Sequence, residues 1–409
     1  MTALVWLTRL LVGGVFTVAG WAKCVDPTGL AIKMGEYTAL WNIDIPSSLL
    51  IVGASLMAGF ELILGVMMLC GCYRRATVIL MLLFTAFFTP LTLYIWLKNP
   101  VSDCGCFGDL FILSNRDTFL KNVILTLALV SLAFFNRRVK GIFVPYTQWI
   151  AGGIVTLYAL VVIGIGLYSQ PLIDFRRFEP GTLITVGASD DDSAEPIYRF
   201  TYTRDGVEKE FDVDNLPDST WTFVDRHLVG GNETATDGFL AYDGDDEVSA
   251  ETFADGQVLL VTIPNPELML AAASIIDDLA ERADGCGIET YLILGGGEET
   301  VSNYVTDMMP AYSVLSAEPT LLKEFARGNI AITLIDNGVI KWKRTMLSLS
   351  RSFLQESDSC DFNELAPPGP AFMWMLTLIF AAVMVTACLL DRGALAIYLL
   401  ARRHKKKKA

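Results

Sequence analysis

Long apolar stretches dominate the first 170 residues of the chain and return near its C-terminus. A helix needs roughly 20 mostly apolar residues to cross about 30 Å of hydrocarbon. Six stretches meet this requirement, so we expect an α-helical integral membrane protein. They run over residues 3–22, 48–70, 75–97, 118–136, 147–169 and 369–390.

The segment between the fifth and sixth stretches has a different pattern. Apolar and polar residues alternate over "IYRFTYTRDGVEKEF" from residue 197, which predicts a hairpin at its "RDG" turn. Further strands and helices follow in mixed order, so we expect a soluble α/β domain here. The expected elements are strands at 256–263 and 289–296, helices at 266–284 and 321–327, and two antiparallel strands about Asn337-Gly338.

Charge separates these two parts. Residues 171–368 hold 37 of the 45 acidic residues and 13 of the 31 basic ones, a net charge of −24, whereas the rest of the chain is +10. A single soluble domain would not divide its charge in this way. The composition therefore favours a membrane protein with an acidic soluble insert.

Basic residues predict the topology, because Lys and Arg collect on the cytoplasmic side of a membrane. Basic clusters follow the second, fourth and sixth stretches, so both termini are expected in the cytoplasm and residues 171–368 in the periplasm of a bacterial inner membrane. The first stretch lacks a basic leader and is expected to be a retained helix. The clusters are Arg74 and Arg75, Arg137 to Lys140, and Arg402 to Lys408.

Two cysteines one residue apart lie in "NPVSDCGCFGDLF" at 99–111. The predicted topology puts Cys104 and Cys106 on the oxidising side, where disulfides form. A bridge at this spacing is only just within reach, and a strained bridge exchanges readily. The spacing therefore allows thiol–disulfide exchange, although both cysteines could also be inert or pair elsewhere.

The remaining cysteines are grouped by the side of the membrane on which the predicted topology puts them. Cys24, at the outer end of the first stretch, is a possible third exchange thiol, and Cys286 and Cys360 in the insert are a possible structural disulfide. Cys70 and Cys72 face the reducing cytoplasm, where we expect a packing role. No metal site is expected, since zinc sites usually need four ligands and histidine is scarce.

Charged residues inside the apolar stretches are a second signal. Glu61 lies near the middle of the second stretch, where a carboxylate is costly and suggests function. Arg9 in the first stretch would lie at similar depth, so we expect a Glu61–Arg9 ion pair that fixes helix packing. The alternative is a protonatable group that serves a quinone or a proton path. Lys23 is expected to reach the interface without a special role.

The first 145 residues resemble the DoxX-like membrane proteins. The similarity rests on "RLLVGGVFTVAGWAK", "FELILGVMML" and, most specifically, "LTLYIWLKNPVSDCGCFGDLFILSNRDTFLKN". The last piece resembles the CGCFG-bearing loop of the DoxX/MauE branch, in particular a Bacteroidetes-type subgroup with a large soluble C-terminal part. The resemblance implies a four-helix bundle whose outer loop carries Cys104 and Cys106. It also implies a link to disulfide formation or to electron delivery to quinone, beside a thioredoxin-like partner.

The insert from residue 238 looks like a TlpA- or MauD-type thioredoxin-like domain. Such domains carry a CxxC motif after the first central strand, where the helix dipole lowers a thiol pKa. This chain has "IPNPELML" at 263–270 instead. We therefore expect a degenerate domain that binds or docks a partner.

Two functions follow from the sequence. One is thiol–disulfide exchange, or electron transfer to quinone, through the Cys104/Cys106 loop. The other is a non-catalytic membrane scaffold whose insert docks a client; a transporter is disfavoured because no inverted repeat is visible. No cofactor motif and no sign of a nucleic-acid partner are evident. The expected organisation is a DoxX/MauE-like domain (1–145), a fifth span (146–170), a β-rich lead-in (171–236), a thioredoxin-like domain (237–368), a sixth span (369–392) and a basic cytoplasmic tail (393–409).

Overall fold

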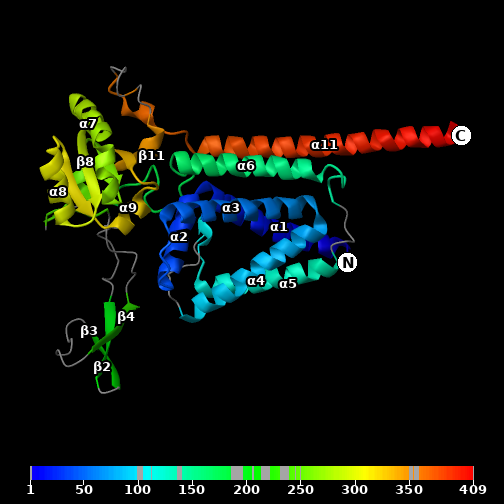
Figure 1. Ribbon diagram of the computed structural model, residues 1–409, viewed down its shortest axis with the longest axis horizontal. Helices are drawn as coiled ribbons and strands as arrows, with labels where there is room; N and C mark the ends of the chain where they lie inside the picture. Colours follow the sequence, from blue (N-terminus) through cyan, green and yellow to red (C-terminus); the bar gives the residue numbers. More distant parts are fainter. Residues whose placement is uncertain are drawn as a thin grey trace. The chain divides into compact units, whose positions relative to one another are not determined.

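The computed structural model divides the chain into two compact units (Figure 1). The helical unit is Met1–Phe175 with Pro367–Ala409, and the soluble unit is Arg176–Ala366. The structure describes residues 2–98, 105–111, 113–135, 141–185, 197–204, 207–212, 222–230, 239–244, 246–248, 250–349, 353 and 359–408. Cys104 lies outside these described residues.

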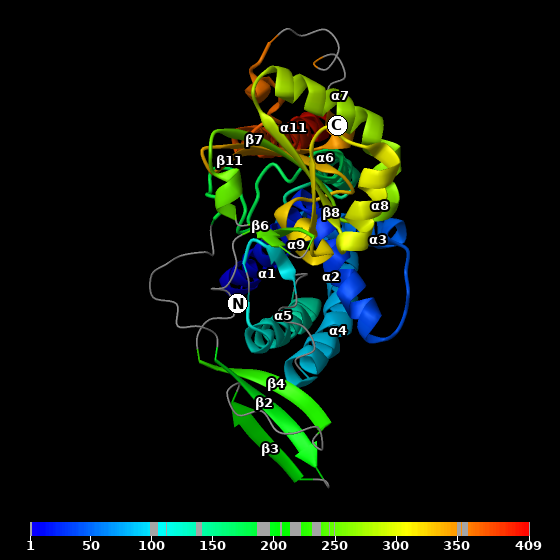
Figure 2. The same ribbon diagram turned by 90° about the vertical axis from the view of Figure 1, so that its left-hand side faces the viewer.

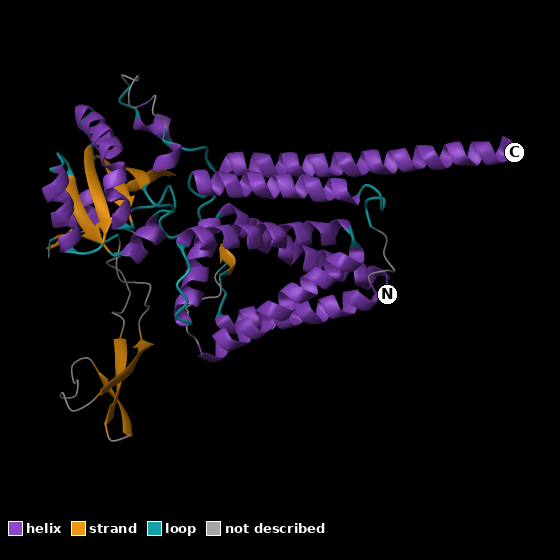
Figure 3. Ribbon diagram, in the orientation of Figure 1, coloured by secondary structure: helices purple, strands orange, loops and turns teal. Residues whose placement is uncertain are grey.

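Six helices of the described residues are long and apolar enough to cross a membrane, which confirms the six predicted spans (Figure 3). One short strand, β1 (Cys106–Asp109), also belongs to this unit. The spanning helices are α1 (Thr2–Val25), α3 (Ser47–Cys70), α4 (Arg74–Lys98), α5 (Asn115–Phe135), α6 (Gln148–Tyr168) and α11 (Pro370–Lys408).

Helices α1 and α3 make the closest pair of the bundle. A Cβ atom at Gly20 would overlap the backbone of Leu62, and one at Gly65 would overlap the backbone of Thr17. Only glycine permits backbones to approach so closely. Helix α4 packs on α5, α6 on α3, and α11 on α6 (Figure 1).

The segment between the first and second predicted spans contains a helix that the hydrophobic pattern does not show. Helix α2 (Pro27–Leu40) begins after Asp26, whose carboxylate accepts a hydrogen bond from the Gly29 N–H at 2.8 Å. Proline in the first turn and an aspartate cap are a common start for a helix. The sequence thus carried a signal for α2, but at 14 residues the helix is too short to stand out as a span.

A seven-stranded sheet forms the centre of the soluble unit, in the order β11-β10-β7-β8-β9-β5-β6. Strands β7, β8 and β9 are parallel, whereas β10 pairs antiparallel with β7 and β11 with β10. The strands are β5 (Ala241–Asp243), β6 (Asp246–Val248), β7 (Gln257–Ile263), β8 (Glu289–Gly295), β9 (Ser313–Ala317), β10 (Ala331–Asp336) and β11 (Val339–Thr345).

Both faces of this sheet are covered (Figure 2). Helices α7 (Met269–Gly285) and α8 (Glu298–Met308) share one core with Leu259 and Val261 of β7. Helix α9 (Pro319–Phe325) and Phe178 of the lead-in share the other core with Leu260. A strand buried on both faces explains the continuous apolar run "VLLV" at residues 258–261.

The hairpin predicted at Asn337-Gly338 is confirmed. Both residues have positive φ angles, 50° and 76°, and Asp336 pairs with Val339 across the turn. Helix α8 and strand β9 are elements that the sequence pattern did not predict. Apart from this sheet, β2 (Ile197–Arg204), β3 (Val207–Asp212) and β4 (Thr222–Gly230) form a three-stranded antiparallel sheet in the order β3-β2-β4.

Candidate functional site

Cys106 opens strand β1, which packs on α1 and α2. The backbone turns tightly here, because the Gly108 N–H donates to the Gly105 carbonyl at 3.0 Å and both glycines have positive φ angles. A Cβ at Gly105 would lie 3.3 Å from the Lys33 side chain of α2. The cysteine is therefore held at the end of the bundle at which α1 ends and α2 begins.

Cys24 lies in the last turn of α1 and is fully buried. Its side chain belongs to a buried apolar cluster that also holds Leu30 and Ala31 of α2. The possible third exchange thiol of the sequence analysis is thus on the helix that β1 contacts.

The partner of Glu61 is Lys23, and the predicted Glu61–Arg9 pair is wrong. Lys23 Nζ lies 2.5 Å from Glu61 Oε2, and both side chains are buried. The close approach of Gly20 to Leu62 sets the register of the two helices and puts Glu61 opposite the last turn of α1. Arg9 lies about 21 Å farther along α1, at 1.5 Å per residue, which is too far to reach Glu61.

Arg9 occupies the other end of α1 and is fully buried there. Its Nη2 donates to the Met68 carbonyl at 3.2 Å, and its guanidinium lies 4.6 Å from the centre of the Trp6 ring. The Nε and Nη1 atoms have no hydrogen-bond partner among the described residues. Arg9 therefore holds the end of α3, where Gly71 follows in a left-handed conformation.

The Cys70–Cys72 segment lies beside Arg9. Cys72 is fully buried, and burial raises the pKa of its thiol to about 12. A thiol of this kind stays protonated at neutral pH and is a poor nucleophile. This property fits the packing role expected from the sequence.

An aromatic cluster joins α1, α6 and α11, and sequence reasoning missed it. Trp21 Nε1 donates to the Tyr158 hydroxyl at 2.9 Å, and that hydroxyl is 2.7 Å from Thr377 Oγ1. Trp21 also stacks on Trp374, and Tyr158 stacks on Phe380. The pattern gave no signal for these contacts, because aromatic residues are ordinary in an apolar stretch.

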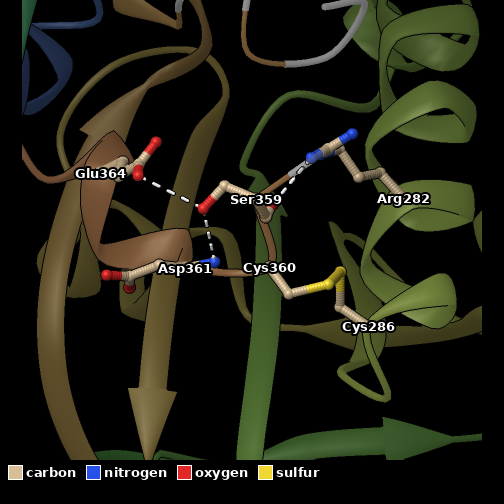
Figure 4. Close-up of a disulfide and its surroundings, with 6 residues drawn as sticks. All are labelled: Arg282, Cys286, Ser359, Cys360, Asp361 and Glu364. Atoms are coloured by element: carbon tan, nitrogen blue, oxygen red, sulfur yellow. Dashed lines mark hydrogen bonds between the residues drawn. A yellow bond between two sulfur atoms is a disulfide. The ribbon is translucent and has the colours of Figure 1, made fainter. Parts of the chain in front are cut away.

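Cys286 and Cys360 form a disulfide in the soluble unit, with Cα atoms 5.5 Å apart (Figure 4). Arg282, one turn before Cys286, donates to the Ser359 carbonyl at 2.7 Å. Asp361 N–H in turn donates to Ser359 Oγ at 3.1 Å. The bridge and the Arg282 hydrogen bond fasten the 359–361 segment to the end of α7, which is a structural role.

The junction of β7 and α7 holds no thiol. Residues 264–268 connect the two elements, and Asn265 Oδ1 accepts from the Glu267 N–H at 3.1 Å. A CxxC motif would stand here in an active thioredoxin-like domain. The described cysteines of the soluble unit are instead the two of the structural bridge.

Comparison with known proteins finds a family similar to the first part of the helical unit. Residues 1–135 match the family model described as methylamine utilisation protein MauE. The first four spanning helices, α1 and α3 to α5, are therefore similar to MauE. The predicted resemblance to MauE is thereby confirmed for these residues. A model for a domain of unknown function, DUF8463, matches residues 196–229, the region of β2 to β4.

One curated relative is Protein TlpB of Flavobacterium psychrophilum. It is 27% identical over 133 residues, which are 32% of this chain and 36% of TlpB. The match thus spans about a third of the length of either protein. No solved structure matches the chain.

Proposed function

We propose that the MauE-like bundle carries out thiol–disulfide exchange at the periplasmic face of the inner membrane, through Cys104 and Cys106. One observation carries the proposal: the strand that begins with Cys106 packs on α1, the helix whose last turn holds Cys24. Cys106 and Cys24 thereby belong to one end of the bundle, and Cys104 precedes Cys106 by two residues in the sequence. The MauE match over residues 1–135 supports the proposal, because it covers all three.

Topology supports the periplasmic assignment. Arg74 and Arg75 open α4, and Arg402 and Arg403 stand near the end of α11. Positive residues favour the cytoplasmic side, so the opposite ends of these helices face the periplasm. The Cys106 strand follows α4 and shares that side, as does the soluble unit between α6 and α11. Exchange partners would be periplasmic thiols or a thioredoxin-like protein.

The bonds and electrons of the exchange step can be followed one by one. A client thiolate attacks one sulfur of a Cys104–Cys106 disulfide, forms a mixed disulfide and releases the other loop cysteine as a thiolate. The second client thiol then resolves the mixed disulfide, so the client is oxidised and the loop is reduced by two electrons. A membrane quinone is the acceptor that would reoxidise the loop. We assign no residues to a quinone site. The Tyr158 hydroxyl in the aromatic cluster could contact a quinone, but it already forms hydrogen bonds with Trp21 and Thr377.

A scaffold is the second candidate, and the soluble unit favours it. The β7–α7 junction holds Pro264 and Asn265 rather than a CxxC motif, and Cys286 and Cys360 are used in a structural bridge. In this alternative the soluble unit docks a client protein and the loop cysteines do no chemistry.

The redox state of the loop in intact cells tests the exchange function. Differential alkylation and mass spectrometry should find a reversible disulfide that includes Cys104, Cys106 or Cys24, and a C104S/C106S variant should lose function. A C388S variant is the matched control, since Cys388 lies on α11. Permanently reduced loop thiols would overturn exchange. A functional C104S/C106S variant, together with loss of function on deletion of residues 171–368, would establish the scaffold.

A further inference from the structure

Arg9 is a fully buried cation whose hydrogen bonding is incomplete. Its Nη2 atom donates to the Met68 carbonyl at 3.2 Å, whereas Nε and Nη1 have no hydrogen-bond partner in the part of the chain that the structure describes. A guanidinium group has five N–H donors and no acceptor, so these nitrogens can only donate. Buried polar groups are nearly always hydrogen-bonded, and the two nitrogens therefore call for an acceptor.

Neighbouring backbone acceptors at the end of α3 are already engaged. The Met67 carbonyl accepts from the Cys72 N–H at 2.9 Å, and the Cys70 carbonyl accepts from the Ile142 N–H at 2.8 Å. Helix ends normally satisfy their last carbonyls in this way. The remaining donors of Arg9 thus need an acceptor from another source.

The chain also lacks a free counter-ion for Arg9. Glu61 is bonded to Lys23 at the opposite end of α1. Asp391 on α11 uses both carboxylate oxygens to accept from the segment before α6. Aspartate and glutamate are absent from residues 1–25, 62–102 and 118–173. A buried charge without a partner is costly, so an anion from outside the chain would stabilise this end of the bundle.

Two glycines connect Arg9 to a second arginine. A Cβ atom at Gly71 would overlap the Arg9 guanidinium, and one at Gly141 would overlap the Gly71 carbonyl oxygen. Arg392 of α11 donates to the Gly141 carbonyl at 2.6 Å. Arg74 opens α4 three residues after Gly71. Positive charge from three helices therefore collects where α3 ends.

We propose that this end of the bundle binds the phosphate group of an anionic membrane lipid, and that Nε and Nη1 of Arg9 donate to the phosphate oxygens. Arginine suits phosphate because several donors in a fixed plane match its oxygens. The proposed topology assigns these residues to the cytoplasmic leaflet, where basic sites between helices bind anionic headgroups. Trp6, whose ring centre lies 4.6 Å from the guanidinium carbon, is of the residue type enriched at headgroup level. The site does not depend on the exchange function.

Native mass spectrometry of the full chain in detergent measures lipid binding directly. Anionic phosphatidylglycerol should bind more tightly than zwitterionic phosphatidylcholine. Arg9→Gln keeps a donor for the Met68 carbonyl but removes the charge. It should weaken phosphatidylglycerol binding by roughly tenfold, because hydrogen bonds to a charged group are lost. Arg403→Gln on α11 is the matched control, and it should change this affinity little.

Thermal unfolding separates the two sources of phosphate. Phosphatidylglycerol should raise the midpoint of the wild-type helical unit, whereas millimolar inorganic phosphate should not. Stabilisation by inorganic phosphate alone, lost in Arg9→Gln, would keep the anion site and assign it to free phosphate.

Two results would overturn the proposal. One is a wild-type chain that binds neither phosphatidylglycerol nor inorganic phosphate better than phosphatidylcholine. The other is a folded Arg9→Gln variant that binds these ligands as the wild type does, with folding checked by circular dichroism. The comparison of ligands on the wild type needs no variant, so it tests the proposal even if Arg9→Gln does not fold.

Discussion

At the scale of the residue, the structure gives Lys23 a different role from the one expected from the sequence. Lys23 was predicted to reach the interface, yet it is 5% exposed and bonded to Glu61. Arg9 has the same charge but contacts a backbone carbonyl and a tryptophan ring at the far end of α1. Lys23 and Arg9 therefore have different partners, because they lie toward opposite ends of α1.

A double-mutant cycle should distinguish these two cations. Removing one partner of a buried pair leaves an uncompensated charge and costs about 3–5 kcal/mol. We therefore expect Lys23→Met and Glu61→Gln to be non-additive in the free energy of unfolding, because their residues are in contact. Arg9→Met and Glu61→Gln should be additive. Denaturant titration in detergent measures both cycles, and coupling between Arg9 and Glu61 would contradict the pairing described above.

Glycine at position 20 should be required for the α1–α3 contact. Gly20→Ala places a Cβ in the backbone of Leu62, and overpacking typically costs about 1–3 kcal/mol. Gly153→Ala on α6 is the matched control, because a Cβ there meets nothing within 4 Å. Thermal unfolding of the two variants should show a lower midpoint for Gly20→Ala alone. Equal midpoints would argue against the close approach.

At the scale of the element, two tyrosine hydroxyls and one carboxylate link α7, α8 and the residue before β9. Tyr304 is fully buried, and its hydroxyl lies 2.8 Å from that of Tyr312, which donates to Asp277 at 3.0 Å. Burial raises the pKa of both tyrosines, and the hydrogen bond to Tyr304 further raises that of Tyr312. The folded soluble unit therefore prefers the neutral phenols.

This preference predicts loss of stability in alkali. Below about pH 10, the ordinary pKa of tyrosine, both states are protonated and the contribution is fully present. Above that pH the unfolded chain releases protons that the folded unit retains, so the free energy of unfolding falls as pH rises. Chemical denaturation of the full chain between pH 8 and about 11 should show the decline in the soluble unit. Tyr312→Phe should flatten it, and an unchanged slope would contradict the coupling.

At the scale of the whole molecule, the two compact units differ in how they are stabilised. The helical unit buries charges and aromatic side chains between apolar helices, whereas the soluble unit has two cores around its sheet and a disulfide. The bridge joins residues 74 positions apart. A loop of that length gives about 4 kcal/mol of stabilisation in the chain-entropy model.

Reduction should therefore act on one unit. In a thermal scan of the full chain, a reductant such as dithiothreitol is expected to lower the transition of the soluble unit by several degrees and leave the transition of the helical unit in place. A C286S/C360S variant should reproduce the shift without reductant. A change in the helical transition would mean that the two units do not unfold independently.

The sequence by itself determined the six spans, the α/β character of the insert and the turn at Asn337-Gly338. These features depend on local composition, since apolar length, strand alternation and turn chemistry are read from neighbouring residues. The MauE resemblance was likewise carried by three short contiguous stretches of the first 145 residues. Tertiary structure alone decided the partner of Glu61, because the choice between Arg9 and Lys23 depends on the register of α1 against α3. That register is set by glycine contacts between helices separated in sequence, which no local pattern encodes.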